Sequence, residues 1–236
     1  MDPDQGDTMP PLLPATQDPY VAWRGPLLAP DLRRENTVLL AIDMQFLDAD
    51  WDSGMCLRAR QAGFEPDLVY YRNRLPAMIS NIQRLQTACR AADLDVIHIK
   101  IQSLLSDGRD RGPMHRALGM LSAPSSREAQ ILPEVAPQEG EIVLTKTTSS
   151  AFNGTALDRV LRALGIHNLI VCGVFTTNCV ESTVRDGADL GYSCLVVEDA
   201  CGALLEEMHV AAIRAMRNVY AHIWSTSQVC AAIDAL

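Results

Sequence analysis

Short runs of apolar residues alternate along most of the chain with longer segments in which apolar residues recur every third or fourth position. The short runs are typical of strands buried on both faces, and the longer segments are typical of amphipathic helices. Strands are predicted over residues 37–43, 94–101, 141–146, 169–174, 193–199 and 221–224. Helices are predicted over residues 68–92, 155–164, 179–190, 206–219 and 228–236. This alternation predicts an α/β protein with a mainly parallel six-stranded sheet between two layers of helices, a three-layer α/β/α fold.

Three regions follow neither pattern. Residues 1–30 hold many of the prolines and are predicted to form an extended N-terminal arm. The second half of this arm is expected to pack against another surface, such as that of a neighbouring subunit. Residues 44–66 are predicted to form a loop. Residues 102–140 contain repeated glycines and prolines, which predicts a long irregular connection of the kind that often forms a lid or a pocket wall. No further boundary is visible, so residues 31–236 are predicted to form one domain.

Composition narrows the class of protein. The 236 residues carry a net charge of −9 without a basic stripe, which argues against a nucleic-acid partner. No stretch approaches the roughly 18 apolar residues of a membrane span, and the first residues lack the basic and apolar segments of a signal peptide. Seven cysteines at irregular spacing indicate reduced thiols rather than a disulfide framework, so a cytoplasmic location is expected.

Three reactive side chains are expected at one edge of the sheet. Asp43, Lys146 and Cys179 each end or closely follow a predicted strand, and the carboxyl ends of parallel strands lie at the same edge. Lysine is scarce, since only Lys100 and Lys146 are lysines among 20 basic residues. Cys179 should lie on the first turn of a helix, where backbone N–H groups favour the thiolate. The carboxylate could then accept the thiol proton while the ammonium stabilises both anions.

Other interpretations of these residues are weaker. The spacing of Cys179 and Arg185 is that of a phosphatase loop, but the residues between them include no glycine and one acid that would repel phosphate. The signatures of serine hydrolases, thioredoxin-like proteins and dinucleotide-binding proteins are absent from the sequence. A Cys–His pair that uses His98 or His115 remains open, although each histidine alone is more typical of packing or of the surface.

No metal site or cofactor is predicted. No two histidines lie at the spacing of metal ligands, and Asp48, Asp50 and Asp52 are more typical of a solvated turn than of a cation site.

Several stretches carry a resemblance to a known family. They are residues 41–45, 144–146, 150–157, 173–183 and 198–200. Taken in their order along the chain, these stretches resemble the isochorismatase-like cysteine hydrolases. The resemblance implies a three-layer α/β/α fold, a homodimer or homotetramer, and a catalytic triad of Asp43, Lys146 and Cys179. It also implies a cis peptide bond between Val174 and Phe175, with the N–H groups of Phe175 and Cys179 forming an oxyanion hole.

The departures from the family pattern narrow the expected activity. Phe175 replaces a threonine that is usual in the family, and the segment after the first strand holds no histidine, which weighs against a nicotinamidase. Family members that cleave a vinyl ether lack the cysteine, so Cys179 favours amide hydrolysis. The chain resembles the biuret hydrolase, ureidoacrylate amidohydrolase and N-carbamoylsarcosine amidase members, although Val219 stands where biuret hydrolase is expected to carry a substrate-reading glutamine.

The sequence therefore predicts a cysteine amidohydrolase that cleaves a C–N bond of a small amide, ureide or carbamoyl compound through a thioester. Gln45, Phe152 and Arg109 are predicted to bind the substrate, and Arg109 or Arg111 could contact a carboxylate if the substrate carries one. Two alternatives stay open: an ether hydrolase of the isochorismatase type with Asp43 as general acid, and a non-catalytic homologue that uses the same pocket for binding.

Overall fold

The computed structural model describes residues 19–236, which contain one parallel sheet. Its strands are β1 (Thr37–Ile42), β2 (Asp95–Ile101), β3 (Ile142–Lys146), β4 (Asn168–Val174), β5 (Ser193–Gly202) and β6 (Ala221–Trp224). Each neighbouring pair is parallel, and the order across the sheet is β3-β2-β1-β4-β5-β6. The predicted six-stranded sheet is confirmed.

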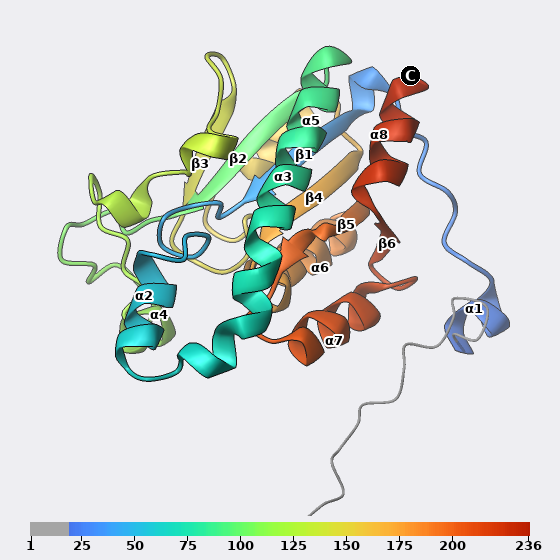
Figure 1. Ribbon diagram of the computed structural model, residues 1–236. Coiled ribbons are helices and arrows are strands. Elements are labelled where there is room, and N and C mark those ends of the chain that lie inside the picture. Colours follow the sequence, from blue (N-terminus) through green and yellow to red (C-terminus); the bar gives the residue numbers. More distant parts are fainter. Residues whose placement is uncertain (1–18) are drawn as a thin grey trace, which may run out of the picture.

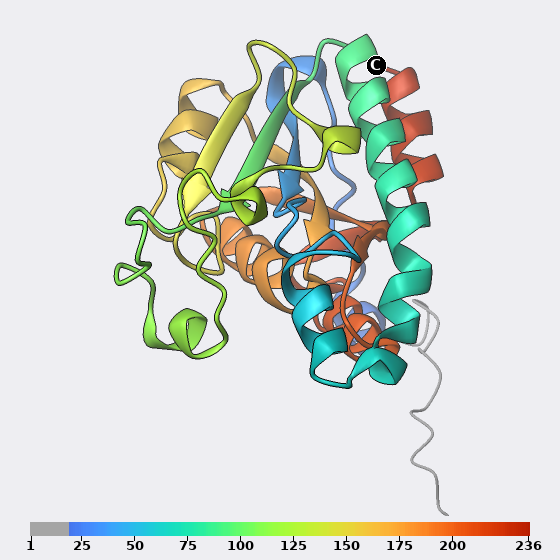
Figure 2. The same ribbon diagram turned by 60° about the vertical axis from the view of Figure 1, so that its left-hand side comes forward.

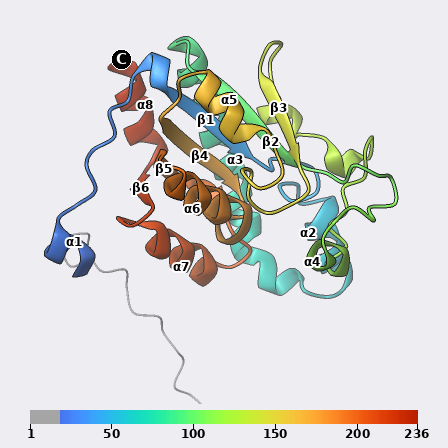
Figure 3. The ribbon, with the colours of Figure 1, turned by 180° about the vertical axis from the view of Figure 1, so that it is seen from behind.

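Helices cover both faces of this sheet (Figures 1 and 3). One face carries α3 (Val69–Ala91) and α8 (Thr226–Asp234), and the other carries α5 (Leu157–Ala163), α6 (Glu181–Asp189) and α7 (Glu206–Met216). A separate apolar cluster fills each interface: Leu75 and Met78 of α3 belong to the first, and Leu161 of α5 and Val184 of α6 belong to the second. The predicted three-layer arrangement is confirmed.

Two short helices lie beyond the carboxyl ends of the strands (Figure 2). They are α2 (Gly54–Gln61) and α4 (Pro113–Ala117), and the single turns η2 (Arg34–Asn36), η3 (Glu65–Leu68), η4 (Arg127–Ala129) and η5 (Pro133–Val135) lie in the connections. The prediction of a loop over residues 44–66 is wrong for α2, because this helix buries only Gly54 and Cys56 and so has no apolar stripe to recognise. Residues 102–140 are otherwise irregular, as predicted.

Some predicted elements have different ends. The helix predicted over residues 179–190 begins earlier, as the π-helical turn η6 (Thr176–Val180), and α7 ends at Met216 instead of residue 219. β5 continues to Gly202 past an irregularity in its pairing with β4. There Gly173 has a φ of +117°, and a Cβ atom would lie 2.0 Å from the Ile42 carbonyl oxygen, so only glycine fits between β4 and β1.

The predicted N-terminal arm is described only from residue 19 onward, and residues 1–18 lie outside the described part of the chain. It contains the short helix α1 (Pro19–Arg24), and Trp23 and Leu28 are 83% and 92% exposed. The boundary at residue 30 stays a prediction. Within residues 19–236, no helix combines the length and the apolar character that crossing a membrane requires.

The strand order places a topological switch point next to β1. The chain runs from β1 through β2 to β3 on one side, and then through β4 and β5 to β6 on the other. Open parallel sheets bind ligands beyond the strand ends at such a point. Asp43 directly follows β1, and Cys179 lies in η6 directly after β4. Two of the three predicted reactive residues therefore lie at the switch point itself.

Candidate active site

Asp43, Lys146 and Cys179 meet at the carboxyl ends of the strands. The Nζ atom of Lys146 lies 2.7 Å from Asp43 Oδ2 and 3.1 Å from Cys179 Sγ. It also donates a hydrogen bond of 3.0 Å to the Thr148 carbonyl oxygen. Asp43 and Lys146 are completely buried, and Cys179 is 7% exposed. The three donors of the ammonium are thus directed at a carboxylate, a thiol and a backbone carbonyl.

The sheet order explains why the cation is a lysine. β2 separates β3 from β1, so the end of β3 lies about 10 Å from the end of β1 at the usual strand spacing. The long flexible stem of Lys146 spans this distance. At the end of β1, the chain turns at Asp43, whose φ of +52° aspartate tolerates better than most residues. The N–H of Asp43 donates to the Ile99 carbonyl oxygen of β2 at 2.9 Å. The stem and the turn together bring the two charges into contact.

Burial and charge set the protonation states of the pair. Burial raises the pKa of the Asp43 carboxyl above its usual value, while Lys146 and a hydrogen bond with Cys179 act in the opposite direction. Burial by itself would lower the pKa of Lys146, but Asp43 and Cys179 together raise it. Lys146 therefore stays charged, and Asp43 is a stronger base than an exposed aspartate, which suits it to accept a proton.

The thiol itself differs from the prediction. Cys179 was expected to favour the thiolate because of its place at a helix start. Burial, and then the neighbouring Asp43 carboxylate, instead raise the pKa of the thiol well above its usual value, although Lys146 opposes them. The helix-start argument fails because it ignored desolvation, and because Cys179 lies in the π-helical turn η6 rather than in the first turn of α6. The resting group in this structure is therefore a thiol rather than a thiolate.

The turn that carries Cys179 follows a cis peptide bond between Val174 and Phe175, as the resemblance implied. The carbonyl oxygen of Phe175 accepts hydrogen bonds from the N–H groups of Asn178 at 3.0 Å and Val180 at 3.2 Å. These bonds close the turn around Cys179. The assignment of the Phe175 and Cys179 N–H groups to an oxyanion hole stays a prediction.

A buried polar chain supports the same turn from behind. Thr176 Oγ1 lies 2.8 Å from His209 Nδ1, and His209 Nε2 lies 3.0 Å from Arg74 Nη2. Burial and Arg74 lower the pKa of His209 to about 3, so the imidazole is neutral. Because a guanidinium can only donate, Nε2 accepts from Arg74, and Nδ1–H donates to Thr176. His209 thus fixes the first residue of η6, a role that its isolated place in the sequence did not indicate.

A second buried acid lies beside the triad. Asp48 was predicted to belong to a solvated turn, but it is 2% exposed. Burial, and then the charge of Asp43, raise its pKa to about 8, so the carboxyl is protonated at neutral pH. Its Oδ1 atom has no hydrogen-bond partner among the described residues. The expectation of a solvated turn is therefore wrong at this position.

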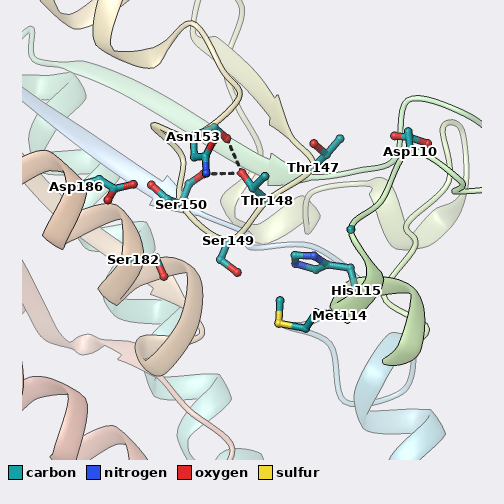
Figure 4. Close-up of a pocket in the computed structure, with 11 residues that line it drawn as sticks. Asp110, Met114, His115, Thr147, Thr148, Ser149, Ser150, Asn153, Ser182 and Asp186 are labelled. Carbon is teal, nitrogen blue, oxygen red and sulfur yellow. Dashed lines mark hydrogen bonds between the residues drawn. The ribbon is translucent and has the colours of Figure 1, made fainter.

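A polar cavity of about 460 Å³ opens beside the triad (Figure 4). The ring of His115, from α4, points into it toward Ser149, and Ser182 of α6 lies on the opposite side. Thr148, whose carbonyl binds Lys146, lines the same cavity. Because Ser182 follows Cys179 by three residues, the cavity runs along the helix that Cys179 precedes.

A second cavity, of about 470 Å³, is mostly apolar. It lies between α2 and the turn η6, and Met55, Met120 and Phe175 are among the residues that line it. Thr177 and Asn178 line it as well, directly before Cys179 in the chain. Cys179 thus lies between a polar and an apolar cavity.

Gln45 differs from its predicted role as a substrate ligand. It is completely buried, and its amide nitrogen donates to the carbonyl oxygens of Ile101 at 3.0 Å and Glu128 at 3.3 Å. Its amide oxygen accepts from the Ile101 N–H at 2.7 Å. These bonds hold the segment after β1 against the end of β2, and they occupy both ends of the amide.

Phe152 and Arg109 also lie elsewhere than predicted. The ring of Phe152 stacks on Tyr192 with centroids 5.6 Å apart, against the face of α6, and it lines neither cavity. The side chain of Arg109 is 72% exposed and pairs with Asp107 at 3.1 Å. The hydrogen bonds and ion pairs of these two residues go to Ser150 and Asp107 rather than to the triad. The arginine that reaches this region is Arg111, which is 2% exposed.

The histidines predicted as possible partners of Cys179 do not bind it. His98 lies 3.0 Å from the Glu141 carboxylate through its Nε2 atom. His115 lines the polar cavity, and burial together with Arg111 and Lys146 lowers its pKa to about 4. Within residues 19–236, no group of three or more His, Cys, Asp or Glu side chains is placed to hold a metal ion.

Comparison with known proteins matches residues 37–228 to the isochorismatase domain. The chain belongs to the isochorismatase family. It is 32% identical to the ureidoacrylate amidohydrolase RutB of Acinetobacter baylyi in an alignment of 212 residues. The alignment covers 83% of this chain and 82% of that protein. The corresponding protein of Pantoea ananatis is 33% identical over 216 residues, covering 84% and 82%. The predicted family is confirmed.

Solved structures share the fold. A cysteine hydrolase from Pseudomonas syringae superposes with a TM-score of 0.76 at 24% identity, covering 89% of this chain and 98% of that one. The N-carbamoylsarcosine amidase of Thermoplasma acidophilum superposes with a TM-score of 0.63 at 24% identity, covering 81% and 96%. Both likenesses support the α/β fold described above.

Proposed function

We propose that this member of the isochorismatase family is an amidohydrolase that uses Cys179 to cleave a C–N bond of a small amide, ureide or carbamoyl compound. The observation that carries the proposal is the position of Lys146 Nζ between Asp43 and Cys179, at 2.7 and 3.1 Å. A buried base, a thiol and a bridging cation are the parts that nucleophilic catalysis at a carbonyl carbon requires. The names of the curated relatives, ureidoacrylate amidohydrolases, support the same reaction class.

The proposed reaction begins with proton transfer from the Cys179 thiol to Asp43. Sγ attacks the substrate carbonyl carbon, and the electron pair of the C=O bond moves to the oxygen, which the N–H groups of Phe175 and Cys179 bind. The C–N bond then breaks, and Asp43 returns the proton to the leaving ammonia or amine. A water molecule gives a proton to Asp43 and attacks the thioester, and the C–S bond breaks. The released sulfur takes that proton back, which restores the thiol.

The test is ammonia release from a panel of carbamoyl compounds, ureides and aryl amides. Cys179→Ala should lose activity by several orders of magnitude, because no covalent intermediate can form. Cys194→Ala is the matched control, since Cys194 is also a buried cysteine of the same apolar cluster, but its sulfur contacts the backbone carbonyls of Val184 and Tyr192. Activity that survives in Cys179→Ala would exclude the thioester mechanism, and cleavage of a vinyl ether by that variant would indicate the ether hydrolase instead.

We further propose that the protein works as a cytoplasmic homo-oligomer. The exposed Trp23 and Leu28 of the N-terminal arm are apolar surface that a second copy could cover. Size-exclusion chromatography with light scattering should give a dimer or tetramer, and a monomer at micromolar concentration would contradict this part of the proposal.

A further inference from the structure

His115 differs from the other buried histidines of residues 19–236. The rings of His98 and His209 are both hydrogen-bonded to neighbouring side chains. His115 is 7% exposed, yet neither of its ring nitrogens has a hydrogen-bond partner among those residues. Buried polar groups are normally paired. The ring of His115 is therefore expected to bind a molecule that is not part of the chain.

The ring of His115 points into the polar cavity beside the triad. Figure 4 shows it directed from α4 toward Ser149. Thr148 lines the same cavity, and its carbonyl oxygen accepts from Lys146 Nζ, which lies 3.1 Å from Cys179 Sγ. The charge of Lys146 also acts on the imidazole. His115 thus lies close to the groups that we propose to react.

The protonation state of His115 limits what the ring can do. Burial, and then the charges of Arg111 and Lys146, lower its pKa to about 4, so the imidazole is neutral at pH 7. A neutral imidazole has one N–H donor and one nitrogen that accepts a hydrogen bond. Such a ring can orient a water molecule while a stronger base, Asp43, removes the proton.

The carboxylates of the polar cavity are less suited to this task. The N–H groups of Leu104 and Leu105 donate to the two oxygens of Asp110 at 2.7 and 3.1 Å and lower its pKa, so this carboxylate is engaged by its own loop. Asp186 follows Cys179 by seven residues, which is about 10 Å along a helix. The serine and threonine hydroxyls of the wall can rotate and either donate or accept. The buried imidazole is the acceptor with a fixed direction.

The apolar cavity is a poor source of water. Met55, Met120 and Phe175 line it, and a water molecule needs two to four polar partners to be held in place. The polar cavity offers such partners in Ser149 and Ser182 as well as in the ring. The water that attacks the thioester is therefore expected to come from the side on which His115 lies.

We propose that His115 is a further catalytic residue, which binds the water that hydrolyses the thioester. One hydrogen of this water passes to Asp43 while the oxygen forms its bond to the carbonyl carbon. The C–S bond then breaks, and Asp43 returns the proton to the sulfur. The second hydrogen is donated to the imidazole in a hydrogen bond, stays on the oxygen and leaves with the acid product. This inference rests on the proposed amidohydrolase function and adds a residue to its second half.

The test measures acylation of Cys179 and hydrolysis of the thioester separately, with 4-nitrophenyl acetate as the probe. The kcat/KM for 4-nitrophenolate release reports acylation, because this release precedes hydrolysis. The decay of the acetylated protein, followed by quenched-flow intact mass spectrometry, reports hydrolysis. His115→Phe keeps a ring without nitrogens, and His115→Gln keeps an acceptor. His167→Phe is the control, since His167 is an exposed histidine directly before β4, at the opposite edge of the sheet. Cys179→Ala gives the blank for acetylation elsewhere.

His115→Phe should slow the decay at least about fivefold, the effect of losing one neutral hydrogen bond, and leave kcat/KM nearly unchanged. His115→Gln should decay at an intermediate rate, and His167→Phe at the native rate. Equal slowing of both steps in His115→Phe would indicate a structural role and overturn the inference, as would an unchanged decay.

A second variant and the site of acetylation keep the outcomes separate. If His115→Phe does not fold, His115→Leu decides by the same two rates. An acetyl group on Cys179 whose decay does not depend on His115 would refute this inference alone. Absence of that acetyl group from the native protein and from all variants would refute the thioester mechanism as well.

Discussion

Replacing Lys146 by methionine tests whether the buried ion pair has the electrostatics that we infer. The variant keeps most of the side-chain volume but leaves the completely buried Asp43 without its counter-ion 2.7 Å away. Removing one partner of a buried pair costs about 3–5 kcal/mol of unfolding free energy. Because this cost falls on the charged form of the carboxyl, the pKa of Asp43 should rise further in the variant.

The pH dependence of that cost follows from its sign. A carboxyl whose pKa is raised by folding holds its proton more tightly in the folded state, so the folded state loses stability as pH rises above the unfolded value, about 3.9. The cost of Lys146→Met should therefore be small near pH 4 and full near pH 8. Adding Asp43→Asn removes the unpaired charge, and the double variant should regain most of the lost stability at pH 8, because neutral replacements of a buried pair are often tolerated.

Urea unfolding monitored by circular dichroism at several pH values measures these effects. Both variants should lack ammonia release, so regained stability without regained activity is the expected signature of the double variant. A cost of Lys146→Met that does not change with pH would refute the reasoning, as would additive losses in the double variant.

Three other outcomes follow from contacts around the site. His209→Leu breaks the hydrogen bonds from His209 to Thr176 and Arg74 behind the turn η6. It should lower kcat at least about tenfold with KM nearly unchanged, and reduce the unfolding free energy by about 1–3 kcal/mol. An unchanged kcat would show that these hydrogen bonds do not position the turn. Burial raises the thiol pKa of both Cys230 and Cys179, but Cys230 is the more accessible, so iodoacetamide at pH 7 should label Cys230 before Cys179; peptide mass spectrometry that finds Cys179 labelled first would contradict a buried, protonated resting thiol. Gln45→Leu should lower the urea midpoint, since it leaves buried backbone groups at the end of β2 unpaired, and an unchanged midpoint would count against the tether.

The sequence predicts the sheet and the meeting of Asp43, Lys146 and Cys179 well, because both depend on local patterns. Buried parallel strands are continuous apolar runs, and the residue at each strand end lies at a common edge whatever the loops do. Asp43, Lys146 and Cys179 could therefore be placed together before any contact was known. The scarcity of lysine strengthened that prediction, because Lys146 had to be explained by something other than a solvated surface.

The remaining site residues depend on how irregular segments fold, which no periodic pattern encodes. Arg109 and Arg111 are two residues apart in one loop, and only the path of that loop decides which of them is buried. Asp48 and the protonation state of Cys179 depend on desolvation, a property of the packed molecule rather than of neighbours in the chain. Gln45 and Phe152 were assigned to the substrate because sequence does not distinguish a residue that supports a site from one that lines it.

The proposed reacting groups and the cavity walls come from different parts of the architecture. Strand ends in the buried sheet hold the base, the cation and the thiol, whereas α2, α4 and the connection over residues 102–140 supply much of the surface around them. Changes in those peripheral segments can alter which molecule is accepted without moving the three side chains that we propose to break the bond. Reaction type and substrate choice can therefore diverge independently in this architecture. Relatives with the same residues at these strand ends can be expected to catalyse the same type of reaction on different substrates.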